Sequence, residues 1–383
     1  MEVPSDNPAV TDLEAHAASA WEFFRSIGSP KFHVAPMVDQ SELAFRQLCR
    51  AHGATAAYTP MLHSRLFLEN PKYRAEHFTT CPEDRPLFVQ FCANDPKTAL
   101  AAAKLVEDEC DAIDLNLGCP QRIAKKGNYG AFLMDDLPKV KAVVEELYRG
   151  LKIPVTCKIR RFPEVEKTIA YARMLESAGC KLLCIHGRLR EQKDASKVLA
   201  DWNYIRAVKA ALKIPVLGNG NVQCLQDAQA LMHETGVDGV MSADPLLCNP
   251  ALFSGRHLSG DANCKVLLEY LDYCAKYPTP MRMVKGHVHR MLRGWFQEHH
   301  DLRDQFNKES HTLAQVRQVA AELSERIAAS GRDEPIPKIT ERAQARKEAE
   351  EARQLAIAAA IAEQKREDDA IQEQLLPEIL EEQ

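Results

Sequence analysis

Short apolar runs alternate with amphipathic stretches from residue 32 to about residue 241. Several runs are apolar throughout, as expected of parallel strands that helices cover on both faces. Eight of them predict strands, at 32–37, 55–59, 87–91, 112–116, 154–159, 182–186, 215–219 and 239–243. Between them, apolar residues recur at helical spacing, and several stretches end in the glycine that commonly follows a helix. They predict helices at 42–53, 96–110, 137–150, 165–179, 201–213 and 226–236.

Eight strands with helices between them favour an α/β fold of the (β/α)8 type, a TIM barrel, over residues 31–258. A doubly wound open sheet is the alternative, because alternation alone does not separate an open sheet from a closed one. The count of eight strands favours the barrel.

The regions on either side of this barrel have a different pattern. Residues 1–30 form an N-terminal extension, and residues 264–330 predict a small all-α domain in which Pro278 and Pro280 separate two helices. Residues 331–383 are rich in Ala, Glu, Gln, Lys and Arg. This composition is typical of a charged tail that is either a solvated helix or disordered.

The charge of the chain is concentrated in that tail. The 383 residues carry a net charge of −5, and residues 331–383 hold 8 basic and 14 acidic residues. The rest of the chain holds 41 basic and 40 acidic residues and is close to neutral. A nucleic-acid surface on the body of the protein must therefore be a local patch.

The sequence favours a soluble protein of the cytoplasm or the nucleus. Its N-terminus is polar and acidic, unlike a signal peptide, and no apolar run approaches the roughly 20 residues of a transmembrane helix. The 12 cysteines include no Cys-x-x-Cys pair and no zinc-finger spacing. We therefore expect reduced thiols, mostly in the core, with no metal site and no membrane partner.

Polar side chains gather where the predicted strands end, which is where a TIM barrel builds its active site. Each of them alone has an ordinary structural explanation, but their arrival at one end of the barrel indicates a functional site. The residues are Gln90, Asn116, Lys158, Arg160, His186, Arg188, Asn219 and Asn221. The small residues at 218–220 and 241–243 follow the last two strands, where TIM barrels commonly bind phosphate. They favour a phosphorylated cofactor.

One cysteine has an unusual setting. Cys119 lies between Gly118 and Pro120 in "DLNLGCPQ", at the exit from an apolar run rather than within it. A core cysteine normally lies inside an apolar element. From its position alone, Cys119 is either a buried structural thiol or a reactive group.

Several motifs together resemble the tRNA-dihydrouridine synthases, flavoenzymes that reduce uridines in transfer RNA. They are "APMVDQSELAFRQLCRAHGA", "VQF", "DLNLGCPQ", "KKGNYGAFL", "TCKIR", "IHGR" and "GNGN", in this order over about 32–255. "CPQRIAKKGNYGAFL", "VMSA" and "NPALF" are most similar to the eukaryotic branch that acts on positions 16 and 17 of the D-loop.

The resemblance implies FMN as cofactor, NADPH or NADH as reductant, and tRNA as substrate. It places Cys119 as the catalytic residue. It implies that the following residues bind FMN: Pro36, Met37, Val38, Gln90, Lys158, His186, Asn219, Gly220, Asn221, Ser242 and Ala243. Many members have Gly-Arg where this chain has Ser242 and Ala243. Backbone amides or another cation must then replace that arginine at the phosphate.

The implied reaction needs a hydride at one carbon of the uracil 5,6 double bond and a proton at the other. Reduced FMN supplies the hydride, and the nicotinamide cofactor then reduces the oxidised FMN again. A cysteine thiol is mostly protonated at pH 7 yet gives up its proton readily, which suits Cys119 as a general acid. Asn116, Arg160 and Arg188 are expected to bind the substrate through its uracil oxygens or phosphates.

The predicted helical domain carries a candidate RNA surface. In "MRMVKGHVHRMLRGWFQEH" a helical projection places Arg282, Lys285, Arg290 and Arg293 on one side and apolar residues on the other. A basic face of this kind suits RNA phosphates, so residues 264–330 are predicted to bind tRNA. The alternatives are a flavin barrel that reduces a free pyrimidine and a non-catalytic tRNA-binding factor. The oligomeric state stays open, with a monomer favoured.

Overall fold

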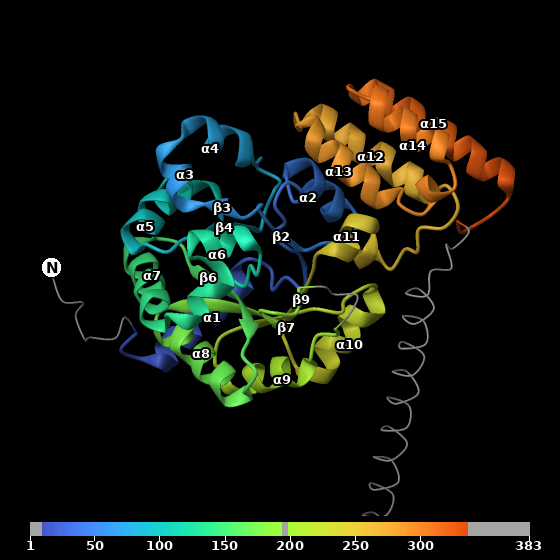
Figure 1. Ribbon diagram of the computed structural model, residues 1–383. Coiled ribbons are helices and arrows are strands. Elements are labelled where there is room, and N and C mark those ends of the chain that lie inside the picture. The colour runs from blue at the N-terminus through green and yellow to red at the C-terminus, as the bar shows by residue number, and fades with distance from the viewer. Residues whose placement is uncertain (1–9, 194–197, 336–383) are drawn as a thin grey trace, which may run out of the picture. The chain divides into compact units, whose positions relative to one another are not determined.

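A closed parallel barrel forms the centre of the molecule, as a computed structural model shows for residues 10–193 and 198–335 (Figure 1). β1 pairs with both β2 and β9, and β2 pairs with β4, so that eight strands close into a ring. The strands are β1 (Phe32–Val34), β2 (Ala56–Tyr58), β4 (Leu87–Cys92), β5 (Ala112–Leu117), β6 (Val155–Arg161), β7 (Cys180–Leu189), β8 (Val216–Asn219) and β9 (Gly239–Ser242). The predicted (β/α)8 fold and all eight predicted strands are confirmed.

Helices surround this ring and begin at side-chain caps in several places. Asp95, Asp136 and Asp201 each accept a backbone N–H bond at a helix start. The helices that alternate with the strands are α2 (Leu43–Ala51), α5 (Pro96–Lys104), α7 (Leu137–Gly150), α8 (Val165–Ser177), α9 (Trp202–Ala211) and α10 (Leu225–Thr235). All six predicted helices are present, although α5 is shorter than predicted and is followed by a 3-10 turn at Glu107–Glu109.

Other short elements were not predicted from the sequence. β3 (Leu62–His63) extends the sheet alongside β4. The short helices are α3 (Ser64–Glu69), α4 (Pro71–His77), α6 (Arg122–Gly127), α11 (Asp244–Cys248) and the 3-10 turns Gly130–Asp135, Leu252–Ser254 and Trp295–Gln297. Most of them lie in loops that leave the carboxyl ends of strands, and they shape the mouth of the barrel.

The N-terminal extension closes the opposite end of the barrel. It contains α1 (Leu13–Ser26), whose first turn is capped by Asp12. Phe24 is buried in one apolar cluster with Tyr58, Phe88 and Leu182 from the barrel. Trp21 Nε1 also donates a hydrogen bond of 2.8 Å to the carbonyl of Lys213. The extension therefore completes the core at the amino ends of the strands.

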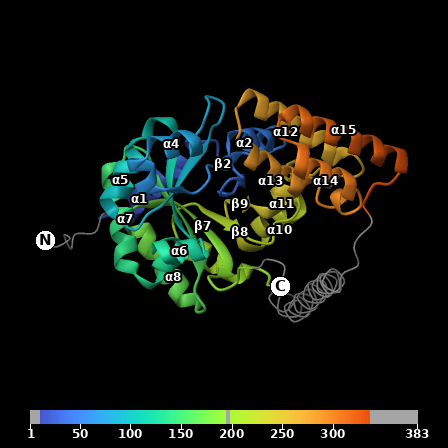
Figure 2. The same ribbon diagram turned by 45° about the horizontal axis from the view of Figure 1, so that its top comes forward.

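Four further helices follow the barrel and pack against its α2 side (Figure 1 and Figure 2). They are α12 (Ala262–Lys276), α13 (Met281–Met291), α14 (His300–Glu309) and α15 (Leu313–Ser330). Glu42 is buried at their junction with α2, 2.6 Å from the hydroxyl of Tyr270 and 3.1 Å from Nε2 of His287. Burial would raise the pKa of Glu42, but these two partners outweigh it, and the pKa is lowered.

The described residues up to Glu334, 10–193 and 198–334, form one compact unit. The predicted tail beyond residue 335 lies outside the described residues. No helix in the described parts of the chain combines the length and the apolar composition needed to cross a bilayer. All twelve cysteines are free thiols and most are buried, as predicted.

Candidate active site

A buried network of polar side chains crosses the inside of the barrel near its carboxyl end. Gln90 donates to Asp114 Oδ2 at 2.7 Å and accepts from Asn116 Nδ2 at 2.7 Å. The hydroxyl of Thr156 donates to the other oxygen of Asp114 at 2.6 Å. Burial raises the pKa of Asp114 to about 6. The sequence prediction missed Asp114, although its spacing of two from Asn116 places both on one face of β5.

Asn116 holds the loop that carries Cys119. Its Oδ1 accepts the backbone N–H groups of Gly118 at 3.2 Å and Cys119 at 2.9 Å. The carbonyl of Cys119 in turn accepts the N–H of Ala131 at 3.1 Å. The Cys119 side chain is half-buried at the carboxyl end of the barrel. The backbone around this thiol is therefore fixed from both sides.

Cationic side chains from β6 and β7 converge on the same end. Lys158 Nζ donates to Oδ1 of Asn219 at 3.0 Å, and burial lowers the pKa of Lys158. Burial, together with the charges of Lys158, Arg160 and Arg188, lowers the pKa of His186 well below its ordinary value. His186 is thus neutral, and its Nε2 accepts a hydrogen bond of 3.0 Å from Arg188 Nη1.

Arg160 has a position that the sequence did not reveal. Its Nε donates to the carbonyl of Gly118 at 2.9 Å, and its Nη1 donates to the carbonyls of Leu189 at 2.7 Å and Gln192 at 3.0 Å. Burial and the nearby charge of Arg188 lower the pKa of Arg160 to about 10. These contacts join the Cys119 loop to the loop after β7. They favour a positioning role, and direct contact of Arg160 with the substrate stays a prediction.

The loops after β8 and β9 form a tightly packed cradle. Gly220 has φ +113°, and a Cβ there would lie 2.5 Å from the Cβ of Ala200 and 3.2 Å from Nε2 of His186. Asn221 exchanges two hydrogen bonds of 2.9 Å with the backbone of Ala200 and accepts one from Arg188 Nη2. Ser242 Oγ donates to the carbonyl of Val222 at 2.9 Å, next to Ala243. The close packing explains why a glycine is needed at residue 220.

This end of the barrel fits a cofactor that carries phosphate. Among the described residues, Lys158, Arg160 and Arg188 donate hydrogen bonds to uncharged groups and form no ion pair with a carboxylate, so no carboxylate compensates their positive charge. Neutral His186 and the amide side chains of Asn219 and Asn221 lie beside them. The residues present are thus compatible with FMN. In the same described part of the chain, no cluster of three His, Cys, Asp or Glu residues is arranged to hold a metal ion.

The predicted basic face at residues 282–293 is less available than the sequence suggested, and α13 itself ends at Met291, before Arg293. Arg282 forms ion pairs with Asp39 at 3.0 Å and Glu76 at 2.6 Å, and Arg290 forms one with Asp244 at 2.8 Å. Lys285 Nζ donates to the carbonyl of Asn307 at 3.3 Å. Arg293 is exposed and has no ion-pair partner among the described residues. Part of this face therefore ties α13 to the barrel, and its contact with tRNA stays a prediction.

The loop of residues 36–38 leaves β1 earlier than predicted, since the strand ends at Val34. Pro36 and Met37 are half-buried, while Val38 is 57% exposed at the rim of the barrel. The backbone N–H of Met37 donates to Ser41 Oγ at 3.0 Å. This bond fixes the loop at the start of α2.

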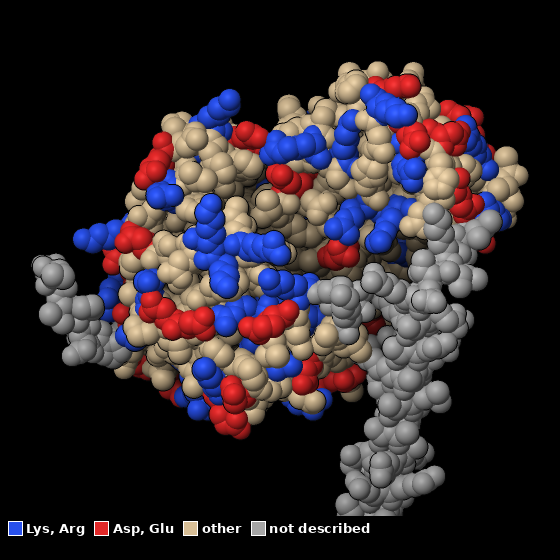
Figure 3. Space-filling view, in the orientation of Figure 1, with Lys and Arg blue, Asp and Glu red and all other residues tan. Residues whose placement is uncertain are grey.

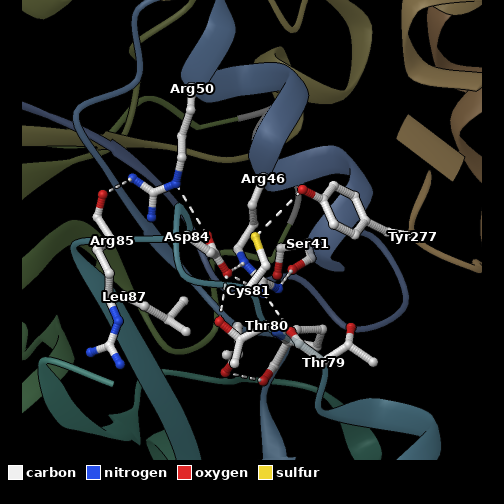
Figure 4. A network of polar contacts seen from close by, with 12 residues as sticks. Ser41, Arg46, Arg50, Thr79, Thr80, Cys81, Asp84, Arg85, Leu87 and Tyr277 are labelled. Carbon is white, nitrogen blue, oxygen red and sulfur yellow. Dashed lines mark hydrogen bonds and ion pairs between the residues drawn. The ribbon is translucent and has the colours of Figure 1, made fainter. Parts of the chain in front are cut away.

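An ion-pair network centred on the buried Asp84 anchors α2 along its length (Figure 4). Asp84 accepts hydrogen bonds from Arg46 at 2.6 and 3.0 Å and from Arg50 at 3.1 Å. Arg46 Nη1 also donates to the carbonyl of Ser41 at 2.7 Å. Burial would raise the pKa of Asp84, but the two guanidinium groups outweigh it and the pKa is lowered. The network links the loop before β4 to the segment that holds Met37.

Changing Asp84 to asparagine should lower the free energy of unfolding by about 3–5 kcal/mol, because the buried Arg46 and the half-buried Arg50 lose their counter-charge. The lowered pKa means that this carboxylate stabilises the fold fully above about pH 4 and less as the pH falls through its folded value. The variant should lose that acid dependence. Denaturant titrations at several pH values measure both effects.

The matched control is Asp301→Asn. Asp301 forms an ion pair with Arg326, and the carboxylate of Asp301 is 62% exposed. This substitution should change the stability by less than about 1 kcal/mol. Equal effects of the two substitutions would show that the buried network has no special importance for the fold.

The fold and the site together define a TIM-barrel protein with a group of cationic side chains and the Cys119 loop at the carboxyl ends of its strands. Residues 33–373 match the family model described as "Dihydrouridine synthase (Dus)". The chain therefore belongs to the dihydrouridine synthase family.

Several curated relatives have names that specify a tRNA-dihydrouridine(16/17) synthase and NAD(P). The one from Mus musculus is 50% identical over 291 residues, which cover 75% of this chain and 61% of that protein. The one from Saccharomyces cerevisiae is 44% identical over 295 residues, covering 74% of this chain and 70% of the relative. A tRNA-dihydrouridine(20a/20b) synthase-like protein of Homo sapiens is 34% identical over 261 residues, which cover 67% of this chain and 80% of that protein. The chain thus spans less than two thirds of the mouse relative it matches.

Proposed function

We propose that this protein reduces the uracil 5,6 double bond of uridines at positions 16 and 17 in the D-loop of tRNA. Its relatives named for that reaction are 44–50% identical to it, whereas the relative named for positions 20a and 20b is 34% identical. The observation that carries the proposal is the Cys119 loop, held by Asn116 and Arg160 at the same barrel end as the cations of β6 and β7.

FMN is the proposed cofactor, with NADPH or NADH as the reductant. When bound, FMN supplies the hydride that one carbon of the uracil ring receives. Lys158 and His186 contribute the polar surface for the ring system, and the loops at 219–221 and 242–243 offer backbone amides to the phosphate. Lys158 or Arg188 supplies the positive charge that an arginine in the second loop would otherwise give. Gln90 and the segment 36–38 complete the proposed cofactor site.

Cys119 is the proposed general acid. A thiol holds a proton at neutral pH and can deliver it to the carbon opposite the hydride. Asn116 and Arg160 fix the backbone on either side of Gly118, so the thiol is aimed before the substrate arrives. Asn116, Arg160 and Arg188 are also proposed to bind the oxygens of the base.

The target uridine must leave the folded tRNA to reach this site, which costs a few kcal/mol of stacking. Lys285 of α13 and Arg293, just beyond the end of this helix, are proposed to offset part of that cost by contact with phosphates. A tRNA substrate and free thiols are both consistent with a location in the cytoplasm or the nucleus.

The direct test is to incubate unmodified tRNA with NADPH and the purified protein, and to map dihydrouridine by mass spectrometry after nuclease digestion. The proposal expects product at positions 16 and 17. Product confined to other positions would contradict the assigned specificity. A free pyrimidine reduced in place of tRNA would contradict the proposed substrate class.

A further inference from the structure

A second cationic surface lies directly after the Cys119 loop, on α6. Arg122, Lys125 and Lys126 all have exposed side chains, and we call them the α6 patch. None of the three forms an ion pair or a side-chain hydrogen bond with a described residue. This differs from α13, where Arg282 and Arg290 are held by carboxylates. The α6 patch thus presents three cations to solvent with their charge uncompensated.

The local structure holds this patch firmly in place. Ala124 is completely buried on the inner side of α6, in a cluster with Cys92 and Tyr129. The helix ends at Gly127, and its C-cap Asn128 has φ +51°. The carbonyl of Gly127 also accepts a hydrogen bond of 2.9 Å from Asn94. The cations therefore project from a packed segment rather than from a freely moving loop.

The position of the patch relates it to the active site. Gln121, the N-cap of α6, is only two residues beyond Cys119, and the backbone after α6 returns to the cysteine through the bond from Ala131 to Cys119. Figure 3 shows basic side chains gathered over α6 and, across a hollow, others near α11 and α13. Ile123 is 67% exposed between the cations of α6. An apolar side chain among unpaired cations suits a ligand that has both phosphates and exposed sugar or base surface.

We infer that the α6 patch binds backbone phosphates of the tRNA close to the target uridine, on the side of the hollow opposite α13. This inference rests on the proposed function. It gives the α6 patch a role in binding tRNA that the sequence analysis did not assign. A free pyrimidine carries no phosphate that these residues would meet. A polynucleotide carries one on each side of the reacting base, and each contact with a lysine or arginine releases a counterion.

The test compares the double variant Lys125→Ala/Lys126→Ala with the wild-type holoenzyme. The affinity for unmodified tRNA is measured over a range of salt concentrations. The dissociation constant of the variant should rise about tenfold or more, and the slope of log affinity against log salt should fall by about 2, one for each phosphate contact. Reduction of the bound flavin by NADPH without tRNA should stay at the wild-type rate.

The matched control is Lys31→Ala/Lys152→Ala. It removes two exposed lysines just before β1 and β6, at the opposite end of the barrel. If the α6 variant binds tRNA like this control, the inference is overturned while the proposed function stands. If flavin reduction by NADPH slows and tRNA binding does not change, the patch binds the reductant and the inference is again overturned. If the wild type binds no tRNA, the proposed function fails first.

Discussion

Changing Cys119 to alanine should lower dihydrouridine formation by about 10²–10⁴-fold, the usual contribution of a general acid. The half-buried side chain is anchored through its backbone to Asn116 and Ala131, and alanine keeps those bonds. The variant should therefore fold, bind flavin and bind tRNA as the wild type does. Turnover is measured by mass spectrometry of tRNA, and binding by titration.

The exposed Cys224 supplies the control for loss of a thiol. Cys224→Ala should keep full activity, because this exposed residue holds the N-cap position of α10 without a side-chain capping bond. Wild-type turnover by Cys119→Ala would remove the cysteine from the reaction. Loss of bound flavin in that variant would instead show that the thiol supports the cofactor site.

Changing Gly130 to alanine should lower turnover by about 100-fold, because a shift of about 1 Å in a catalytic group has an effect of that size. Gly130 has φ +64°, and a Cβ there would lie 2.8 Å from the carbonyl oxygen and 3.0 Å from the Cβ of Cys119. The loop must move to relieve this contact. The rate constant for tRNA reduction, measured with saturating tRNA, reports the displacement of the thiol.

Gly236→Ala separates this effect from backbone strain. Gly236 has φ +71°, similar to that of Gly130, but a Cβ there would meet nothing within 4 Å. Both variants should lose about 1 kcal/mol of stability through strain, and only Gly130→Ala should lose activity. Equal activities of the two variants would contradict the role given to the Cys119 loop.

The barrel could be predicted from the sequence because its strands are uniformly apolar and regularly spaced. The same pattern predicted the position of Gln90, Lys158 and His186, since the carboxyl end of each strand marks one rim of the barrel. Helix α1 was missed because its buried residues pack against strands far away in the chain, a contact that local spacing does not reveal. The two-residue strand β3 carries too little pattern to be recognised.

Charge partners were the hardest feature to predict. Arg282 and Arg290 belong to a helix whose projection shows a basic face, but their carboxylate partners Asp39, Glu76 and Asp244 come from other parts of the chain. The same limit applies to Arg160, whose side chain holds backbone carbonyls of two loops. A sequence pattern identifies the charged groups, and only the fold shows which of them are already neutralised.

The most direct measurement is a single turnover without oxygen. The protein with bound FMN is first reduced by NADPH, freed of excess reductant, and then mixed with unmodified tRNA. The proposed function expects the flavin to be reoxidised as dihydrouridine forms at positions 16 and 17, in proportion to the flavin present. A flavin that stays reduced with tRNA, yet is reoxidised by a free pyrimidine, would contradict it.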